Sequence, residues 1–110
     1  MEEALYDTSI VIRIVARDRQ KIPGYISVLT VIEYPPALNY ASKILYPEKR
    51  DYHLAIKWQT LLRKKGNPIP AVDLIIAAQA CNRSLTLIAS DKHFEILKKE
   101  ATPNIKLVLK

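Results

Sequence analysis

The feature that most constrains this chain is a regular alternation of short apolar runs with helical segments. Strand-like runs are predicted at residues 4–6, 25–28, 44–46, 85–89 and 105–109, and helices at residues 48–65, 73–83 and 92–100. Strands that alternate with helices form a parallel sheet covered on both faces. We therefore predict a three-layer α/β/α fold around a central parallel sheet of four to five strands. No linker or repeat interrupts the 110 residues, so we expect one domain over residues 1–110.

The segment 48–65 has the clearest helical pattern. Leu54, Trp58, Leu61 and Leu62 recur at positions i, i+4, i+7 and i+8, which places them on one face of a helix. Gly66 follows and suits the left-handed conformation that commonly ends helices. We interpret Trp58 as a core residue or an anchor of a dimer interface.

Two early segments are harder to assign. Residues 10–15 are rich in β-branched side chains, which favours a strand, while Thr8 and Ser9 before them are good helix N-caps. Thr30 and Glu33 match a capping box and predict a helix start, although the prolines at 35 and 36 keep that helix short.

Composition excludes several classes of protein. Charged residues interrupt every apolar run long enough to span a membrane, and the acidic start of the chain does not resemble a signal peptide, so no membrane partner is expected. The single cysteine, Cys81, cannot form an internal disulfide, and we expect a cytoplasmic protein. No phosphate-binding glycine fingerprint occurs. The net charge of +6 favours polyanionic partners such as nucleic acid.

Four acidic residues follow predicted strands or lie near predicted helix starts. They are Asp7, Glu33, Asp73 and Asp91. In an open parallel sheet these positions gather along one edge, where ligands bind. Two carboxylates about 4 Å apart repel each other by roughly 4 kcal/mol at an effective dielectric near 20, and a divalent cation removes that repulsion. The alternative is that each acid simply caps or stabilises a helix N-terminus, and position alone does not decide between these readings.

Ordered motifs strengthen the metal interpretation. The sequence resembles PIN domains, in particular the small VapC-type ribonuclease toxins, in Asp7-Thr8-Ser9 and in residues 26–33, 66–78 and 87–94. The resemblance covers nearly the whole chain. It implies a PIN-like fold, and it implies that residues 10–20 are helical despite their β-branched side chains.

The resemblance also implies a site and a function. Asp7, Glu33, Asp73 and Asp91 match the acids that hold Mg²⁺ or Mn²⁺ in the family, and Ser9 matches the hydroxyl that supports the first acid. The chain departs from the pattern at Ala89, where the family has threonine and where Ser90 could substitute, and at His93, where the family has aspartate. We interpret His93 itself as a surface helix residue. The implied activity is a metal-dependent endoribonuclease, with RNA as substrate.

The expected partners are a cognate antitoxin and a second copy of the chain. The homodimer is predicted because the apolar residues Ile10, Ile14 and Val15 and the tyrosine-rich segment 34–46 exceed what a small sheet needs as cover. Two alternatives remain open. A receiver-type signalling domain has a similar topology, but Asp7 lacks the acidic neighbour that such a domain needs. A PIN-like domain that binds RNA or a partner without cleavage also fits, given Ala89 and His93.

Overall fold

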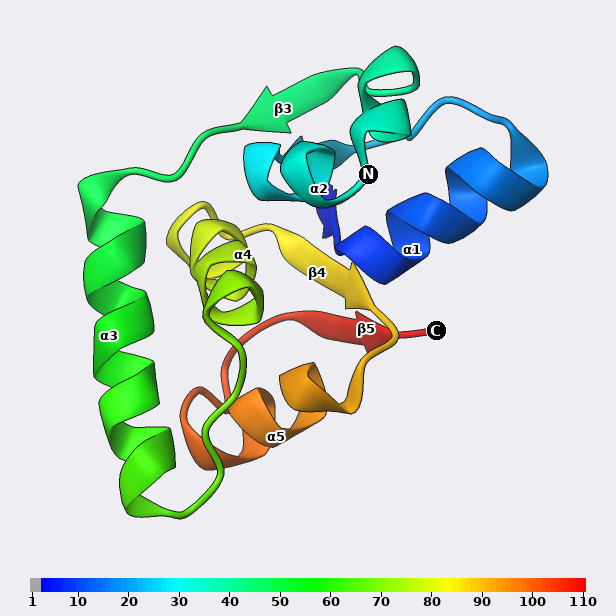
Figure 1. Cartoon of the computed structure of the whole chain (residues 1–110). Helices are drawn as coiled ribbons and strands as arrows, with labels where there is room; N and C mark the ends of the chain where they lie inside the picture. The colour runs from blue at the N-terminus through cyan, green and yellow to red at the C-terminus, as the bar shows by residue number, and fades with distance from the viewer. Residues whose placement is uncertain (1–2) are drawn as a thin grey trace.

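A computed structural model describes residues 3–110 and contains a five-stranded, fully parallel sheet with the strand order β3-β2-β1-β4-β5 (Figure 1). The elements are β1 (Ala4–Tyr6), α1 (Thr8–Ile12), η1 (Arg13–Asp18), β2 (Tyr25–Ser27), α2 (Val28–Glu33), η2 (Pro35–Asn39), β3 (Lys43–Leu45), α3 (Lys49–Lys64), α4 (Ala71–Asn82), β4 (Thr86–Ala89), α5 (Lys92–Glu100) and β5 (Leu107–Leu109). The first three strands are added in one direction, and the chain then returns to place β4 on the other side of β1. The strand order therefore reverses between β1 and β4.

Two hydrophobic cores lie on the two faces of the sheet. The larger core joins Trp58 and Leu62 of α3 with apolar residues of α4 and α5, and it reaches the sheet through Leu5 and Leu87. The smaller core lies under α1, η1 and η2 and reaches the sheet through Ile26. Successive strand residues point to opposite faces, so these two cores make the three layers of the predicted α/β/α fold.

The long helices begin and end close to their predicted limits. Segment 48–65 is observed as α3, Lys49–Lys64, and Gly66 just after it has φ +78°, the left-handed conformation that glycine adopts without strain. Helix α4 begins two residues before the predicted start, because Pro70 occupies its N-cap position and Asp73 lies within the first turn. Trp58 is buried in the larger core. No helix within residues 3–110 is long and apolar enough to cross a membrane.

The ambiguous segment after β1 is helical, as the resemblance implies. It starts at Thr8 as α1 and continues as a π-helix, η1. Ile10, Ile14 and Val15, from which a homodimer surface is predicted, do not form an exposed surface in this segment. Ile10 and Val15 are each 4 % exposed, and Ile14 packs against the smaller core. Most of the β-branched side chains therefore pack within their own chain, and Ile12 is the one left exposed, at 39 %.

The predicted capping box at Thr30 and Glu33 is wrong. Helix α2 begins earlier, at Val28, and the hydroxyl of Ser27 accepts the N-cap hydrogen bond from the backbone N–H of Leu29 at 3.1 Å. Thr30 is buried inside the helix and Glu33 is its last residue. The helix starts directly at the end of β2, which leaves no room for a turn between them.

Candidate metal centre

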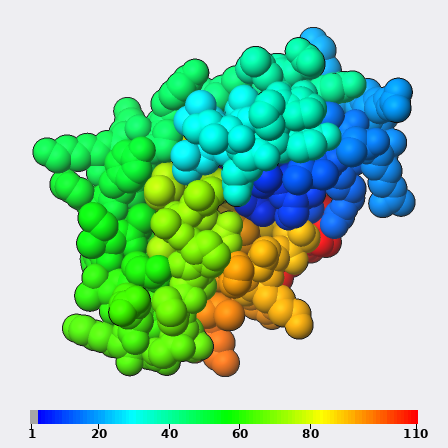
Figure 2. All heavy atoms as spheres, viewed as in Figure 1, coloured from blue at the N-terminus to red at the C-terminus, as the bar shows by residue number. Residues whose placement is uncertain are grey.

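The carboxyl ends of β1 and β4 bring two of the predicted acids to the point where the strand order reverses. Tyr6 pairs with Ile88 in the parallel ladder, and the backbone N–H of Asp7 donates to the carbonyl of Ile88 at 2.9 Å. Asp7 therefore leaves β1 at the level where β4 leads into Asp91. Figure 2 shows atoms of the N-terminal segment (blue), of the α2 region (cyan) and of the α5 region (orange) meeting on one face.

Asp7 is a buried acid with few partners. It is 4 % exposed, and burial, together with the negative charge of Asp73, raises the pKa of its carboxyl to about 6. Hydrogen bonding from the backbone N–H of Thr8 opposes this shift most, and the backbone N–H and the hydroxyl of Ser9 add to it. The Ser9 hydroxyl lies 3.1 Å from Oδ2 of Asp7. Asp7 occupies the N-cap position of α1.

Ser9 and Ser90 form a link between the two strand ends. Their hydroxyl oxygens are 2.7 Å apart, across 81 residues of sequence. Because Ser9 also contacts Asp7, Ser90 supports the first acid through Ser9. Ala89 has no hydroxyl to offer, so the serine one residue later supplies the polar contact on this side of the site.

Asp73 projects from the first turn of α4 and lies among the other acids. Burial raises the pKa of its carboxyl, and the charges of Asp91 and Glu33 raise it further, while a hydrogen bond with His93 lowers it. Its carboxylate cannot close a capping box, because the N-cap residue of α4 is Pro70, which has no backbone N–H. Asp73 thus interacts electrostatically with all three other predicted acids, since it also raises the pKa of Asp7.

His93 lies in α5 and is partly exposed, as its interpretation as a surface helix residue predicts, but its ring also lies against two of the predicted acids. Its side chain is 38 % exposed, and its Nδ1 lies 2.9 Å from Oδ2 of Asp73 and 3.2 Å from Oδ1 of Asp91. The same Oδ1 of Asp91 accepts the backbone N–H of His93 at 2.9 Å, as an N-cap of α5. The capping reading is therefore correct for Asp91, but Asp91 also faces the other acids.

Glu33 reaches the site from the last residue of α2. The hydroxyl of Thr8 donates to Glu33 Oε1 at 2.7 Å, and the hydroxyls of Thr8 and Thr30 are 2.9 Å apart. Two threonines from different helices thus hold the carboxylate at the edge of the site. Thr8 precedes Ser9 directly, so one pair of adjacent hydroxyls contacts two of the four acids.

The donor set fits a divalent cation. Within residues 3–110, one atom each of Asp73, Asp91 and His93 lie within 4.8 Å of one another, and all three side chains are partly exposed. Asp7 and Glu33 lie outside this group, but both interact electrostatically with Asp73. The charge of Glu33 raises the pKa of Asp73, and the charge of Asp73 raises the pKa of Asp7. Carboxylate oxygens suit Mg²⁺ and Mn²⁺, and an imidazole nitrogen suits transition ions. A cation would compensate both the burial and the mutual repulsion that raise the pKa values of Asp7 and Asp73.

Three polar residues of the site were not predicted from the sequence, namely Thr8 and Thr30 as hydroxyl donors and His93 as a neighbour of the acids. Thr8 was interpreted as an N-cap, Thr30 as part of a capping box, and His93 as a surface residue. The contact of His93 with the acids could have been predicted from its position two residues after Asp91, at the start of a predicted helix. A side chain in a first helical turn lies near the N-cap residue.

Comparison with known proteins identifies the fold. No protein-family model and no curated protein matches the chain. Solved structures do match. A DNA-bound VapBC from Salmonella typhimurium matches with 18% identity, a TM-score of 0.73 and 98% of each chain covered. VapBC2 from Rickettsia felis, bound to a promoter DNA fragment, matches with 18% identity and a TM-score of 0.74, over 96% of this chain and 97% of that one.

A third match has the same character. VapBC-1 from nontypeable Haemophilus influenzae is 21% identical, with a TM-score of 0.72 and 96% of each chain covered. At this identity the likeness concerns the path of the backbone, and it includes the strands and helices that carry the predicted acids. The chain therefore has the predicted PIN-like α/β fold, shared over nearly its full length with these VapBC structures.

Proposed function

We propose that the chain is a Mg²⁺- or Mn²⁺-dependent endoribonuclease and the toxin of a toxin–antitoxin pair. The observation that carries this proposal is the convergence of Asp7, Glu33, Asp73 and Asp91 where the strand order reverses. Two of these carboxyls, those of Asp7 and Asp73, have raised pKa values, and in both burial is the largest cause and a neighbouring acid raises the pKa further. Perturbed acids gathered in this way are typical of functional sites.

The side chains of the site have two roles, which are to hold the cation and to orient the carboxylates. Asp73, Asp91 and His93 would hold the cation, with Asp7 and Glu33 completing the negative charge around it. Thr8 and Ser9 orient two carboxylates through their hydroxyl groups. When bound, divalent cations polarise phosphodiester oxygens and activate water for in-line hydrolysis. No nucleophilic side chain of the protein is needed for that reaction.

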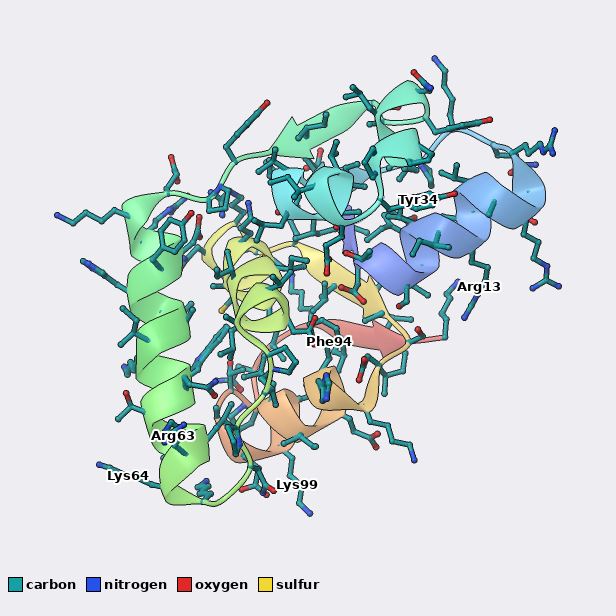
Figure 3. The ribbon with its side chains drawn as sticks, in the orientation of Figure 1. Arg13, Tyr34, Arg63, Lys64, Phe94 and Lys99 are labelled. Atoms are coloured by element: carbon teal, nitrogen blue, oxygen red, sulfur yellow. The ribbon has the colours of Figure 1, made fainter. Side chains whose placement is uncertain are left out.

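RNA as the substrate agrees with the charge of the chain. The net charge is +6 although the site itself is acidic, so the basic residues lie outside it. Lys92 directly follows Asp91, and Arg13 lies about one helical turn after Ser9. Figure 3 shows Arg13 projecting from η1, while Arg63, Lys64 and Lys99 project from the opposite end of the molecule. Basic side chains on more than one side can contact the phosphates of a polynucleotide.

A cleavage assay tests the activity. Wild-type protein is incubated with single-stranded RNA in EDTA, Mg²⁺ or Mn²⁺, beside Asp73→Asn. We expect cleavage only with metal and a loss of at least about 100-fold in Asp73→Asn, because a ligand carboxylate is removed. Asp18→Asn removes a carboxylate at the exposed end of η1 and serves as the matched control. Cleavage by Asp73→Asn at the wild-type rate would contradict the proposed site. Metal binding without cleavage would favour a domain that only binds RNA or a partner.

The proposal includes an antitoxin and a second copy of the chain as partners. VapBC complexes share the fold, which supports the first. For the second, the apolar side chains available to a partner are Ile32, Leu38, Tyr46 and Ile56, each more than half exposed. An adjacent reading frame for a small antitoxin-like protein is the expected genetic context. A dimer is expected in light scattering at high micromolar concentration, and a strictly monomeric species there would contradict it.

A further inference from the structure

His93 gives this site a ligand that a purely acidic site lacks. Its Nδ1 is the atom nearest to both neighbouring carboxylates, at 2.9 Å from Asp73 and 3.2 Å from Asp91. A neutral imidazole carries one N–H, so in the absence of metal Nδ1 can donate one strong hydrogen bond, to Asp73 or to Asp91 but not fully to both. Oδ2 of Asp73 and Oδ1 of Asp91 thus compete for a single N–H of His93.

The spacing of these atoms suits a shared coordination shell. Ligands bound about 2.1 Å from an octahedral ion lie about 3.0 Å from their neighbours in the shell, because adjacent bonds meet at a right angle. Both Nδ1 distances are close to that value. The position of the helix supports the same arrangement, since Phe94, which follows His93, is 1 % exposed in the larger core and fixes the first turn of α5.

From this geometry we infer that His93 is a metal ligand and that it shifts the preference of the site from Mg²⁺ toward Mn²⁺. The inference rests on the proposed metal-dependent function and names the ion that the site selects. Mg²⁺ prefers oxygen ligands and keeps several waters, whereas imidazole is a better ligand for first-row transition ions. Ligation through Nδ1 requires the Nε2–H tautomer, so a neutral ring with its hydrogen on Nδ1 gives that proton to solvent and takes one up at Nε2 when the ion binds, with no net release.

Pulsed electron paramagnetic resonance on Mn²⁺ tests the ligand directly and needs no activity. The chain has two histidines, and His53 is exposed on α3. His53→Asn therefore leaves His93 as the sole histidine and is the matched control. We expect nitrogen modulation from bound Mn²⁺ in wild type and in His53→Asn, and a change in that modulation when histidine carries ¹⁵N. In His93→Asp the modulation should disappear while Mn²⁺ still binds through the carboxylates of the site.

Binding titrations test the selectivity. In wild type we expect a Mn²⁺ Kd at least about tenfold below the Mg²⁺ Kd. His93→Asp should reduce that ratio about tenfold, chiefly by tightening Mg²⁺, whereas His93→Asn should weaken Mn²⁺ without favouring Mg²⁺. Circular dichroism checks that the variants are folded.

The outcomes separate this inference from the proposed function. Mn²⁺ that binds wild type without nitrogen modulation, or an unchanged Mn²⁺/Mg²⁺ ratio in His93→Asp, would overturn the role of His93 and leave the acidic metal site intact. Wild-type protein that binds neither ion would overturn both. Nitrogen modulation that persists in His93→Asp would assign the ligand to another residue and would equally contradict the inference.

Discussion

Two buried aspartates of this chain have opposite electrostatic surroundings. Asp51, near the start of α3, is 0 % exposed, and Asp7, at the end of β1, is 4 % exposed. The carboxylate of Asp51 accepts hydrogen bonds from the backbone of Glu48 at 2.7 Å, from Asn82 at 2.8 Å and from two nitrogens of Arg83, each at 3.0 Å. Burial alone would raise the pKa of Asp51, but these partners more than offset it and lower the pKa.

Asp7 has no such set of partners. Among the described residues its donors are neutral, namely the backbone N–H groups of Thr8 and Ser9 and the Ser9 hydroxyl, and its charged neighbour is another acid, Asp73. Its pKa is raised to about 6 where that of Asp51 is lowered. Within residues 3–110, Arg83 thus supplies a cation for the buried acid between α3 and α4, and no basic side chain pairs with the buried acid at the sheet edge. This difference distinguishes a carboxylate that stabilises the fold from one that suits an external cation.

Removing the internal cation of Asp51 should give the largest effect. In Arg83→Met a buried carboxylate loses its charged partner but keeps Asn82 and the Glu48 backbone. We expect the free energy of unfolding to fall by about 3–5 kcal/mol, measured by urea denaturation at pH 7. Arg50→Met is the matched control, because Arg50 is exposed, contacts Glu48 and should change stability by less than about 1 kcal/mol. Equal stability of Arg83→Met and wild type would show that Asp51 does not need the arginine.

Asp7 and Asp51 illustrate which features could be predicted from the sequence and which could not. The alternation of strands and helices, the position of Asp7 after β1 and that of Asp73 near a helix start depend on local patterns, and these predictions of the fold agree with the structure. Glu33 was expected at a helix start and lies at a helix end, because Ser27 caps α2 one turn earlier. The Asp51–Arg83 pair spans 32 residues, and the Ser9–Ser90 contact spans 81. Such pairs depend on how helices pack, which no local pattern reports.

Removing the charge of Asp7 should have the opposite sign and a smaller size. A folded-state pKa of about 6, against an ordinary value of 3.8, corresponds to about 3 kcal/mol of destabilisation at neutral pH. Asparagine removes this cost, but burial of its amide costs about 1 kcal/mol. We therefore expect metal-free Asp7→Asn to be more stable than wild type by about 2 kcal/mol at pH 7. Urea denaturation in EDTA measures it, and a loss of stability would contradict the view of Asp7 as an acid without a counter-ion.

The gain in stability of Asp7→Asn should depend on pH. Between about pH 4 and pH 6 the folded wild type binds a proton on Asp7 that the unfolded chain has released, so stability falls as the pH rises through this range. In Asp7→Asn that fall should be absent. Asp51 acts oppositely, because its pKa is lowered, and its contribution is lost only as the pH falls below about 4. Identical pH profiles for wild type and Asp7→Asn would rule out the raised pKa.

Adding a cation should restore part of the stability lost at the sheet edge. An ion that binds only the folded state at tenfold excess over its Kd stabilises by about 1.4 kcal/mol, which raises the Tm by roughly 4–8 °C for a domain of this size. We expect this rise with Mn²⁺ in wild type and a much smaller one in Asp73→Asn. Without metal, Asp73→Asn should melt no lower than wild type, since one negative charge is removed. Equal shifts in the two proteins would place the cation away from Asp73.

The smallest effect on stability should come from substitutions of Asp91, whose side chain both caps a helix and faces the proposed metal site. Its Oδ1 caps α5 through the backbone N–H of His93 and also lies 3.2 Å from the His93 ring. Asparagine caps a helix about as well as aspartate, so Asp91→Asn in EDTA should change stability by less than about 0.5 kcal/mol, while Asp91→Ala should lose about 1 kcal/mol with the cap. The metal-induced rise in Tm should shrink in both variants, because both lack the carboxylate. Differential scanning calorimetry with EDTA and with excess Mn²⁺ separates the two roles. If Asp91→Asn kept the full wild-type response to Mn²⁺, capping would be the whole role of Asp91, and the metal site would have to be built from Asp7, Glu33, Asp73 and His93 alone.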